Sequence, residues 1–320
     1  MLYEIHMLKN YPPTNLNRDD SGAPKSCQFG GTNRGRSQCL KRSWRTSPLL
    51  AQAIGTEHLG TRTRRLPDLV AEKLEEMGAS QEYIQELLPK LSGFGNKDGK
   101  ENKDGNYTAQ VIFYAPEDIQ AVADVVKEKL DACETLKQVK ALKAKDLQEA
   151  VKGAEVRPVT LDMALFGRMV TSTAFINVEA SMQVAHAVST HALDLESDYF
   201  TAVDDLLTGQ DETGAGMIGD IDFDSCCYYQ YASLDMDKLR ENLKDSPEAL
   251  ARVDELIPVL LRVMALSNPS GKQNSFAGHV APDAMLVEFK PEKIPLSYVN
   301  AFAKPVSRYS TQIVKDSTDR

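Results

Sequence analysis

The chain has 320 residues, of which 42% are hydrophobic and 26% are charged, and this composition excludes a protein that is disordered as a whole. No apolar run approaches the roughly 18 residues that span a bilayer, and the first ten residues lack the apolar run of a signal peptide, so we expect a cytoplasmic protein with no membrane partner. The formal net charge of −9 argues, taken alone, against a nucleic-acid partner.

The N-terminal segment predicts one strand, a long loop and a basic helix. Tyr3, Ile5 and Met7 alternate with polar residues, which is the period of a half-buried strand. Residues 11–36 are rich in proline, glycine and asparagine and predict an irregular loop, of a length that is usually functional or disordered. Residues 37–45 (SQCLKRSWR) then predict a short helix with clustered basic side chains.

A helical block follows. Residues 66–91 carry apolar side chains at helical spacing, and Pro116 opens another helix. Between them, residues 92–108 repeat Asn-Lys-Asp-Gly twice and predict a mobile polar loop. In residues 136–145 apolar side chains alternate with lysines on a helical stretch, so residues 60–155 predict a helical block inserted into another domain.

The C-terminal half predicts helices that pack on a sheet. Residues 178–195 are rich in small side chains and favour a helix, and a second helix is expected around residues 236–266. The glycines of residues 214–219 favour a hairpin or loop, and apolar alternation over residues 285–289 predicts a final strand. This order of elements predicts an α+β fold of the ferredoxin-like kind.

The bulk charge hides an asymmetry. Residues 1–65 hold eleven Lys/Arg against four Asp/Glu, a net charge of +7, whereas the other 255 residues hold 26 against 42, a net charge of −16. Because the local field decides whether a polyanion binds, a nucleic-acid partner is compatible with the acidic total. The alternative is a solvated basic surface.

Several motifs are weak evidence for a cofactor, a metal or catalysis. Gly214–Gly219 matches G-x-G-x-x-G but lacks the following helix that a dinucleotide site needs, and His186 and His191 are not spaced to share a metal on one helix face. Asp220, Asp222 and Asp224 alternate on a predicted strand and are expected to be exposed to solvent. The five cysteines predict reduced thiols. We therefore expect no cofactor, no metal site and no enzyme activity.

Eight segments, in this order, resemble one family: LNRDDSGAPK (16–25), FGGTNRGRSQCLKRSWR (29–45), ALFGRM (164–169), QVAHAVSTHALD (183–194), DYFTAVDDL (198–206), GAGMIGDIDFDSCCYYQYA (214–232), GKQNSFAGH (271–279) and PLSYVNAFAKPV (295–306). They resemble the CasC family, the backbone subunit of the type I-E CRISPR surveillance complex Cascade, which coats the guide RNA. The resemblance spans residues 3–306.

The resemblance implies a hand-like protein with an RRM-type ferredoxin-like palm. The palm would comprise residues 1–59, 166–196 and 226–320, with a helical fingers insertion at 60–165 and a β-hairpin thumb at 197–225. Members of the family polymerise along one CRISPR RNA and present it for pairing with target DNA in antiviral defence. The implied partners are therefore CRISPR RNA, target DNA, other copies of the chain and other Cascade subunits.

The resemblance also implies binding residues. Arg18, Lys25, Lys41 and Arg45 match positions that contact guide phosphates, which position RNA without reading its sequence. Met169 matches a residue that wedges beside a kinked guide nucleotide, and Tyr199 and Phe200 match the aromatic pair at the base of the thumb. The remaining expected RNA contacts are Arg34, Arg36, Lys272 and Gln273. The expected DNA contacts, similar to lysines of the family's fingers, are Lys137, Lys140, Lys143 and Lys145.

Two alternatives stay open. One is a metal-dependent endoribonuclease subunit that cuts target RNA, for which Asp19 and Asp20 in the N-terminal loop are the first suspects. The other is a general single-strand RNA-binding protein. The bases of an RNA can stack on aromatic rings, but core packing explains these aromatic residues equally well: Tyr199, Phe200, Tyr228, Tyr229 and Tyr231.

Overall fold

The computed structural model describes residues 1–320 apart from residues 38, 104, 154–157 and 203–216. The chain divides into two compact units. The sheet unit comprises Met1–Leu50, Gln183–Asp235 and Ile257–Arg320, and the helical unit comprises Ala51–Met182 and Met236–Leu256. Helices and antiparallel sheets together make an α+β fold, which confirms the predicted class. The helical unit contains the predicted insertion at 60–165 and extends beyond it on both sides.

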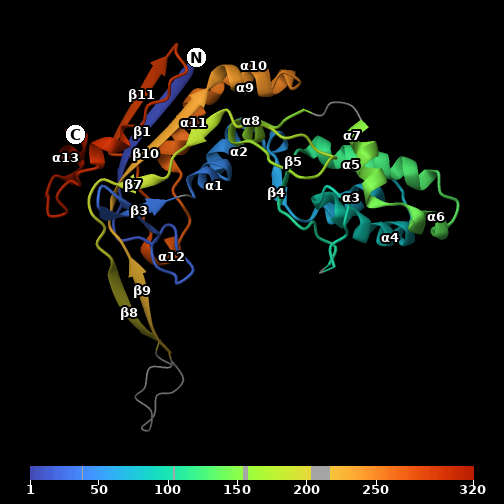
Figure 1. Cartoon of the computed structure of the whole chain (residues 1–320), viewed down its shortest axis with the longest axis horizontal. Coiled ribbons are helices and arrows are strands. Elements are labelled where there is room, and N and C mark those ends of the chain that lie inside the picture. Colours follow the sequence, from blue (N-terminus) through green and yellow to red (C-terminus); the bar gives the residue numbers. More distant parts are fainter. Residues whose placement is uncertain (38, 104, 154–157, 203–216) are drawn as a thin grey trace, which may run out of the picture. The chain divides into compact units, whose positions relative to one another are not determined.

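The sheet unit is built on a large antiparallel sheet, whose central strands lie side by side in Figure 1. Among the described residues its strand order is β11-β1-β10-β7-β3-β2, with β6 also paired to β10. These strands are β1 (Leu2–Asn10), β2 (Ser26–Phe29), β3 (Thr32–Ser37), β6 (Met182–Val184), β7 (Ala187–Ser189), β10 (Cys227–Asp235) and β11 (Ala284–Lys290). The helices of the sheet unit, with the two that run across a boundary between units, are α1 (Leu40–Arg45), α2 (Pro48–Ile54), α11 (Val253–Leu266), α12 (Gln273–Phe276), the 3-10 helix η3 (Tyr298–Phe302) and α13 (Ile313–Thr318).

Strand β1 lies between β11 and β10 in this sheet. It pairs with β10 over nine residues and with β11 over seven. The predicted strand is confirmed, but the expectation that it is half-buried is wrong, because Leu2 and residues Glu4 to Lys9 are all buried. Both faces are covered, so polar side chains on β1 must find partners inside the protein.

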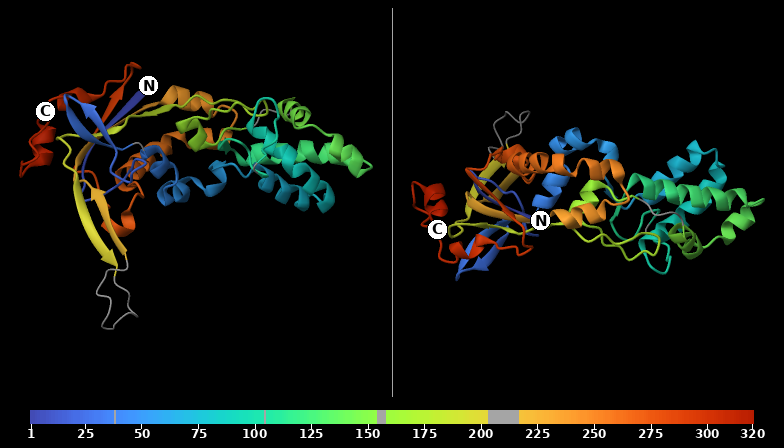
Figure 2. Two further views of the ribbon diagram at one scale, coloured as in Figure 1. Left: turned by 60° about the horizontal axis from the view of Figure 1, so that its bottom comes forward. Right: turned by 90° about the horizontal axis from the view of Figure 1, so that it is seen from above.

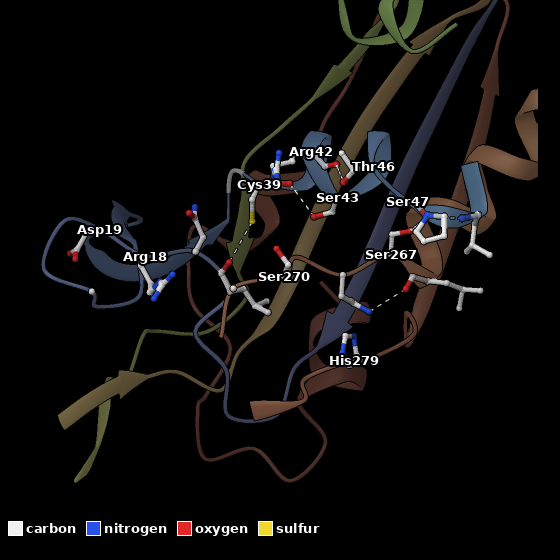
Figure 3. Close-up of a pocket in the computed structure, with 18 of the residues that line it drawn as sticks. Arg18, Asp19, Cys39, Arg42, Ser43, Thr46, Ser47, Ser267, Ser270 and His279 are labelled. Carbon is white, nitrogen blue, oxygen red and sulfur yellow. Dashed lines mark hydrogen bonds between the residues drawn. The ribbon is translucent and has the colours of Figure 1, made fainter. Parts of the chain in front are cut away.

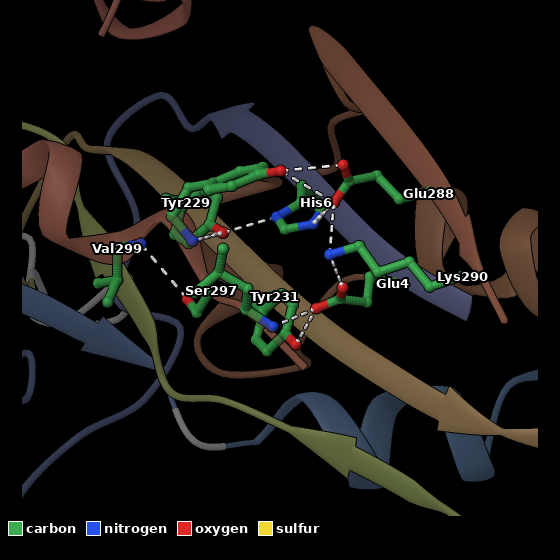
Figure 4. A network of polar contacts seen from close by, with 10 residues as sticks. Glu4, His6, Tyr229, Tyr231, Glu288, Lys290, Ser297 and Val299 are labelled. Atoms are coloured by element: carbon green, nitrogen blue, oxygen red, sulfur yellow. Dashed lines mark hydrogen bonds and ion pairs between the residues drawn. The ribbon is translucent and has the colours of Figure 1, made fainter. Parts of the chain in front are cut away.

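On one face of the sheet these partners form a polar cluster (Figure 4). The carboxylate of Glu4 accepts hydrogen bonds from the Tyr231 hydroxyl at 2.5 Å and the Leu296 backbone N–H at 2.7 Å, and it pairs with Lys290. The His6 ring stacks on Tyr298 with centroids 4.5 Å apart. Burial raises the pKa of Glu4, but the hydrogen bonds from Lys290, Tyr231 and Leu296 together bring that pKa below its ordinary value. The segment around residues 296–298 is thus fixed over the sheet.

A hairpin projects from the sheet unit in the views of Figures 1 and 2. It consists of β8 (Glu196–Ala202) and β9 (Met217–Phe223), paired from Glu196↔Phe223 to Ala202↔Met217. The expectation of a hairpin around the glycine-rich stretch is confirmed, although Gly214 and Gly216 lie outside the described residues. Most side chains of both strands are exposed or half-buried, so the hairpin has no core of its own.

The helical unit packs amphipathic helices around a large apolar core, and a smaller apolar cluster contains Phe113, Ala115, Met163 and Val178. Its elements are η1 (Thr56–His58), β4 (Thr61–Thr63), α3 (Leu66–Glu76), α4 (Gln81–Ser92), η2 (Gly93–Gly95), β5 (Ile112–Tyr114), α5 (Pro116–Asp131), α6 (Leu136–Ala141), α7 (Ala144–Gly153), α8 (Leu161–Phe166), α9 (Met236–Asn242) and α10 (Pro247–Ala251). The helical pattern of residues 66–91 is two helices, because Gly78 adopts a φ of 76°, which ends α3. The predicted helix start at Pro116 is confirmed.

The prediction of a helix over residues 178–195 is wrong. This segment instead contains β6 and β7, and Val188 and Ser189 pair with Tyr229 and Tyr228 of β10. Its alanines favour a helix, but helix propensity is a weak preference that tertiary strand pairing overrides. The helix expected around 236–266 is three helices, α9 to α11, separated near Ser246 and Arg252.

We predict that Lys9 makes stability depend on pH in the alkaline range. Lys9 is 1% exposed, its ammonium group donates to the Met264 carbonyl at 3.0 Å, and burial lowers its pKa from 10.5 to about 8. Between these two values the unfolded chain binds more protons than the folded chain, so the free energy of unfolding rises as the pH increases. One unit of pKa shift is worth about 1.4 kcal/mol, so the full gain is about 3 kcal/mol.

Urea unfolding of the wild type and Lys9→Met from pH 7 to 11 tests this prediction. The free energy of the wild type should increase relative to that of Lys9→Met between pH 8 and 10.5. Lys315→Met, which removes an exposed lysine of α13, should give a curve parallel to the wild type. Parallel curves for the wild type and Lys9→Met would contradict the prediction.

Candidate nucleic-acid interface

A groove of about 1030 Å³ opens on the sheet unit (Figure 3). Three segments line it: the loop at residues 16–22, α1 and the residues that follow it, and the loop at residues 266–279. Its polar lining residues are Asn17, Arg18, Asp19, Asp20, Ser21, Cys39, Arg42, Ser43, Thr46, Ser47, Ser267, Asn268, Ser270 and His279. Guanidinium, imidazole, hydroxyl and amide groups are those that contact the phosphates and sugars of nucleic acids.

The N-terminal loop is fixed to the base of the hairpin. Thr14 and Asp224 exchange both backbone hydrogen bonds, at 2.8 and 2.9 Å. The side-chain amide of Asn15, which is fully buried, donates to the carbonyl of Gly22 at 2.9 Å and to that of Asp222 at 2.8 Å. The Asn15 amide therefore connects the loop to β9. Arg18, which lies between Asn15 and Gly22 in the chain, is exposed and lines the groove.

The two suspect aspartates have different environments. The Asp19 carboxylate accepts hydrogen bonds from the Ser21 hydroxyl at 2.6 Å and from the backbone N–H groups of Ser21 and Ala23 at 2.9 and 3.2 Å. The hydrogen bond from the Ser21 hydroxyl is the largest cause of the lowered pKa of Asp19. Asp19 thus closes the turn that carries Arg18, and Asp20 is exposed beside it.

The glycine-rich loop after α11 packs closely against the N-terminal loop. A Cβ atom at Gly271 would lie 2.3 Å from the Leu16 carbonyl oxygen, so only glycine fits there. Lys272 follows with a φ of 49° and directly precedes α12, and the Gln273 amide donates to the Pro269 carbonyl at 2.9 Å. The Phe276 ring lies 5.6 Å from that of Phe223 in β9, so the end of the short helix that follows the predicted residue Lys272 and contains Gln273 packs against the hairpin.

Helix α1 presents a different basic residue to the groove from the two that the sequence predicted. Arg42 lines the groove and is exposed, whereas Lys41 and Arg45 are half-buried and do not line it. Burial lowers the pKa of Lys41. Arg42 and His279 are candidate contacts that sequence reasoning missed, although both lie in segments that the resemblance singled out, residues 29–45 and 271–279. Asn268 also lines the groove, but its amide oxygen accepts from the Tyr11 hydroxyl at 2.7 Å and its amide nitrogen donates to the Val280 carbonyl at 2.9 Å, so it is a structural residue of the groove wall.

Arg34 is a correction to the predicted set. Its side chain is fully buried, and the guanidinium donates to the Thr32 hydroxyl at 2.6 Å and to the Phe302 carbonyl at 3.0 Å. A charge used in this way does not reach a ligand, so Arg34 is a structural residue of the sheet unit. The backbone of Arg36 pairs with Val188, and its side chain lies outside the described structure. Lys25 is half-buried, and its N–H donates to the Asn17 carbonyl at 2.9 Å.

The aromatic residues divide into two groups. Tyr228, Tyr229 and Tyr231 are buried in the sheet, which resolves them as core residues. Tyr199 on β8 is 65% exposed, and Phe200 lies across its partner Gly219, where an added Cβ would be 2.6 Å from the ring. Tyr199 is therefore available to a ligand, and Phe200 packs along the hairpin.

Other predicted residues lie in the helical unit. Met169 is 93% exposed. Lys137 and Lys140 are exposed on α6, where Lys140 lies 3.8 Å from Glu86, and Lys143 and Lys145 are exposed at the start of α7. The expected continuous helix through these lysines is broken between Ala141 and Ala144.

Among the residues that the structure describes, no three His, Cys, Asp or Glu side chains gather in a way that could hold a metal. The His191 ring hydrogen-bonds the Ala192 carbonyl at 2.8 Å and accepts from the Cys227 N–H at 3.3 Å. Asp224 is 2% exposed, so its expected exposure is wrong, and burial raises its pKa while Tyr228 donates to it at 2.9 Å. Over the described residues, no helix has both the length and the hydropathy to cross a bilayer.

Comparison with known proteins connects this arrangement to the family that the sequence motifs indicated. A chain described as CRISPR RNA-guided surveillance complex, pre-nicking, superposes with a TM-score of 0.79 at 26% identity, covering 100% of this chain and 87% of that chain. A second, described as CRISPR RNA-guided surveillance complex, has a TM-score of 0.66 at 22% identity, covers 100% of this chain and 86% of that chain, and shows the fold alone. No curated protein matches the chain. The family model of CT1975-like proteins matches residues 3–320, and the chain belongs to this family.

Proposed function

We propose that the chain is an RNA-binding backbone subunit of a type I-E Cascade surveillance complex in the cytoplasm. It polymerises along a CRISPR RNA and presents the guide for pairing with target DNA, and it has no enzyme activity of its own. The observation that carries the proposal is the likeness over the whole chain to a surveillance-complex subunit, at a TM-score of 0.79.

The topology of the sheet unit supports the palm assignment. The sheet contains four strands that can be numbered first to fourth in chain order: β1, β7, β10 and β11. They lie side by side in the order β11-β1-β10-β7, that is, fourth, first, third, second. Helices follow the first and the third of these strands. This is the arrangement of the ferredoxin-like fold to which RRM domains belong. The β8–β9 hairpin corresponds to the thumb and the helical unit to the fingers.

The groove supports the guide-binding assignment. Arg18 and Arg42 line it from two different segments, and the side-chain amide of Asn15 ties the loop of Arg18 to the hairpin. Positively charged side chains on a fixed loop bind the phosphates of a guide whatever its sequence, because they do not contact base edges. A subunit that carries many different guides needs this property.

We expect the chain, co-expressed with a repeat-spacer transcript and the other Cascade subunits, to elute from a sizing column as a large species rich in absorbance at 260 nm. Extraction should yield RNA of one discrete length. The same preparation with an unrelated transcript should give no such species. A monomer free of nucleic acid in both preparations would contradict the proposal, and equal binding of both transcripts would favour a general RNA-binding protein.

We predict that Arg18, Lys25, Lys41 and Arg45 contribute to the salt dependence of guide binding. Each phosphate contact should add about 0.7 to the slope of log affinity against log salt concentration. Alanine at any one of them should flatten the slope by that amount for every guide sequence. Filter binding from about 50 to about 500 mM salt measures this slope. Arg42→Ala should do the same, and Lys315→Ala should not. An unchanged slope would remove that residue from the interface.

We predict that no target RNA is cut. Target RNA incubated with the assembled complex and Mg²⁺ or Mn²⁺ should stay intact, and Asp19→Ala and Asp20→Ala should leave the result unchanged. Asp19 serves the turn of its loop, as its three hydrogen bonds from Ser21 and Ala23 indicate. Metal-dependent cleavage that either substitution abolishes would establish the endoribonuclease alternative instead.

A further inference from the structure

Met169 stands out among the apolar residues of the helical unit. It is 93% exposed, although its neighbours Arg168 and Val170 are 5% and 8% exposed. An unbranched side chain with three rotatable bonds gains no fixed position by itself when it points into solvent. If it acts at a defined place on a ligand, the backbone that carries it must be held by other residues.

The loop that begins at Arg168 and ends at Val178 is closed at its base. Arg168 and Val178 exchange two backbone hydrogen bonds, at 2.9 and 2.8 Å. Next to them, the Val170 N–H donates to the side-chain oxygen of Asn177 at 2.7 Å. Met169 lies between these two closures, and its backbone is therefore restrained from both sides.

The side chain of Arg168 fixes the loop to the helical core. Its Nε donates to the Ile176 carbonyl at 2.9 Å, and its Nη1 donates to the Phe113 carbonyl at 3.3 Å and to Asp118 Oδ2 at 2.5 Å. The side chains of Arg168 and Asp118 are 3% and 1% exposed. A guanidinium joins three separate elements here: the far side of the loop, β5 and α5.

Asp118 also makes a hydrogen bond at the start of α5. Its Oδ2 also accepts a hydrogen bond at 2.9 Å from the N–H of Ala115, the residue that precedes α5. The same carboxylate oxygen thus closes the first turn of α5 and holds Arg168. Val122 and Val126 of α5 are fully buried in the core of the helical unit, so the loop is anchored to a helix of that core.

We propose that Arg168 and Asp118 are positioning residues, which hold the 168–178 loop so that Met169 meets the bound RNA at one defined nucleotide step. This inference rests on the proposed function. A buried ion pair is weak evidence for stability, since an apolar pair of similar volume often does as well, but it specifies one geometry. A lysine would keep the charge but could not donate in the fork that joins Ile176, Phe113 and Asp118.

The experiment uses the assembled complex with guides that carry 2-aminopurine at successive positions, since this base fluoresces more strongly when it is unstacked. In the wild type, fluorescence should be high at the nucleotide beside Met169, and Met169→Ala should lose that signal. Arg168→Lys and Asp118→Asn should lose it as well, while guide affinity stays within about twofold of the wild type, because the phosphate contacts are untouched.

Hydrogen exchange of the chain without RNA provides an independent readout. Arg168→Lys should accelerate exchange of the Val170 and Val178 amides at least about tenfold, whereas Val122 and Val126 in α5 keep their protection. Asn177→Ala removes one closing hydrogen bond from an exposed position and should act in the same direction, even if the buried variants fail to fold. Asp68→Asn is the matched control, since it breaks an exposed Arg65–Asp68 pair of 2.7 Å in the same unit.

The outcomes separate this inference from the proposed function. Faster exchange of the loop together with a lost base signal and unchanged affinity supports the positioning role. A base signal that persists in Arg168→Lys or Asn177→Ala while the loop exchanges faster overturns the positioning role alone. If the wild type binds no guide, both the positioning role and the proposed function fall.

Discussion

The nine-residue pairing of β1 with β10 is the constraint on which the rest of the sheet unit depends. Its register runs from Leu2↔Asp235 to Asn10↔Cys227, and it continues past the strand ends through the hydrogen bond from the Tyr11 N–H to the Cys226 carbonyl and the Thr14–Asp224 pair. The N-terminal loop therefore leaves the sheet where the hairpin enters it. A shift by one residue would turn the buried side chains of β1 to the opposite face and would also separate the loop from the hairpin.

This register reconciles the acidic chain with a polyanionic partner. The excess positive charge lies within residues 1–65, and the register brings part of that segment against the hairpin and the loop of α12. The groove is not uniformly basic, because Asp19 and Asp20 line it with Arg18 and Arg42. Asp19, however, directs its carboxylate into its own turn. Local geometry thus determines which charges meet a ligand, and the total charge reports on the other surfaces.

Local pattern was sufficient where an element is decided by its own sequence. The alternation in β1 and β11 and the proline at the start of α5 predicted the observed elements, and the glycine-rich stretch predicted a hairpin, whose described strands are β8 and β9. Local pattern failed where a segment distant in the sequence determines the structure. The segment of β7 becomes a strand because Tyr228 and Tyr229 pair with it, and Arg34 is buried because the Phe302 carbonyl, 268 residues away, accepts its hydrogen bond. The resemblance singled out the segment that ends at His279, but no local pattern showed that the fold brings His279 beside α1.

The two kinds of contact in the proposed interface require different degrees of order. A phosphate contact depends on charge and falls off slowly with distance, so hydrogen bonds of the loop backbone and one asparagine suffice to hold Arg18. An apolar side chain that inserts at one nucleotide step acts only within van der Waals distance, where a gap of about 1 Å already forfeits up to about half of the attraction. In the proposed positioning role, the buried Arg168–Asp118 pair holds the loop of Met169 within this distance. A buried ion pair specifies one geometry, which is what the proposed positioning role of Arg168 and Asp118 requires.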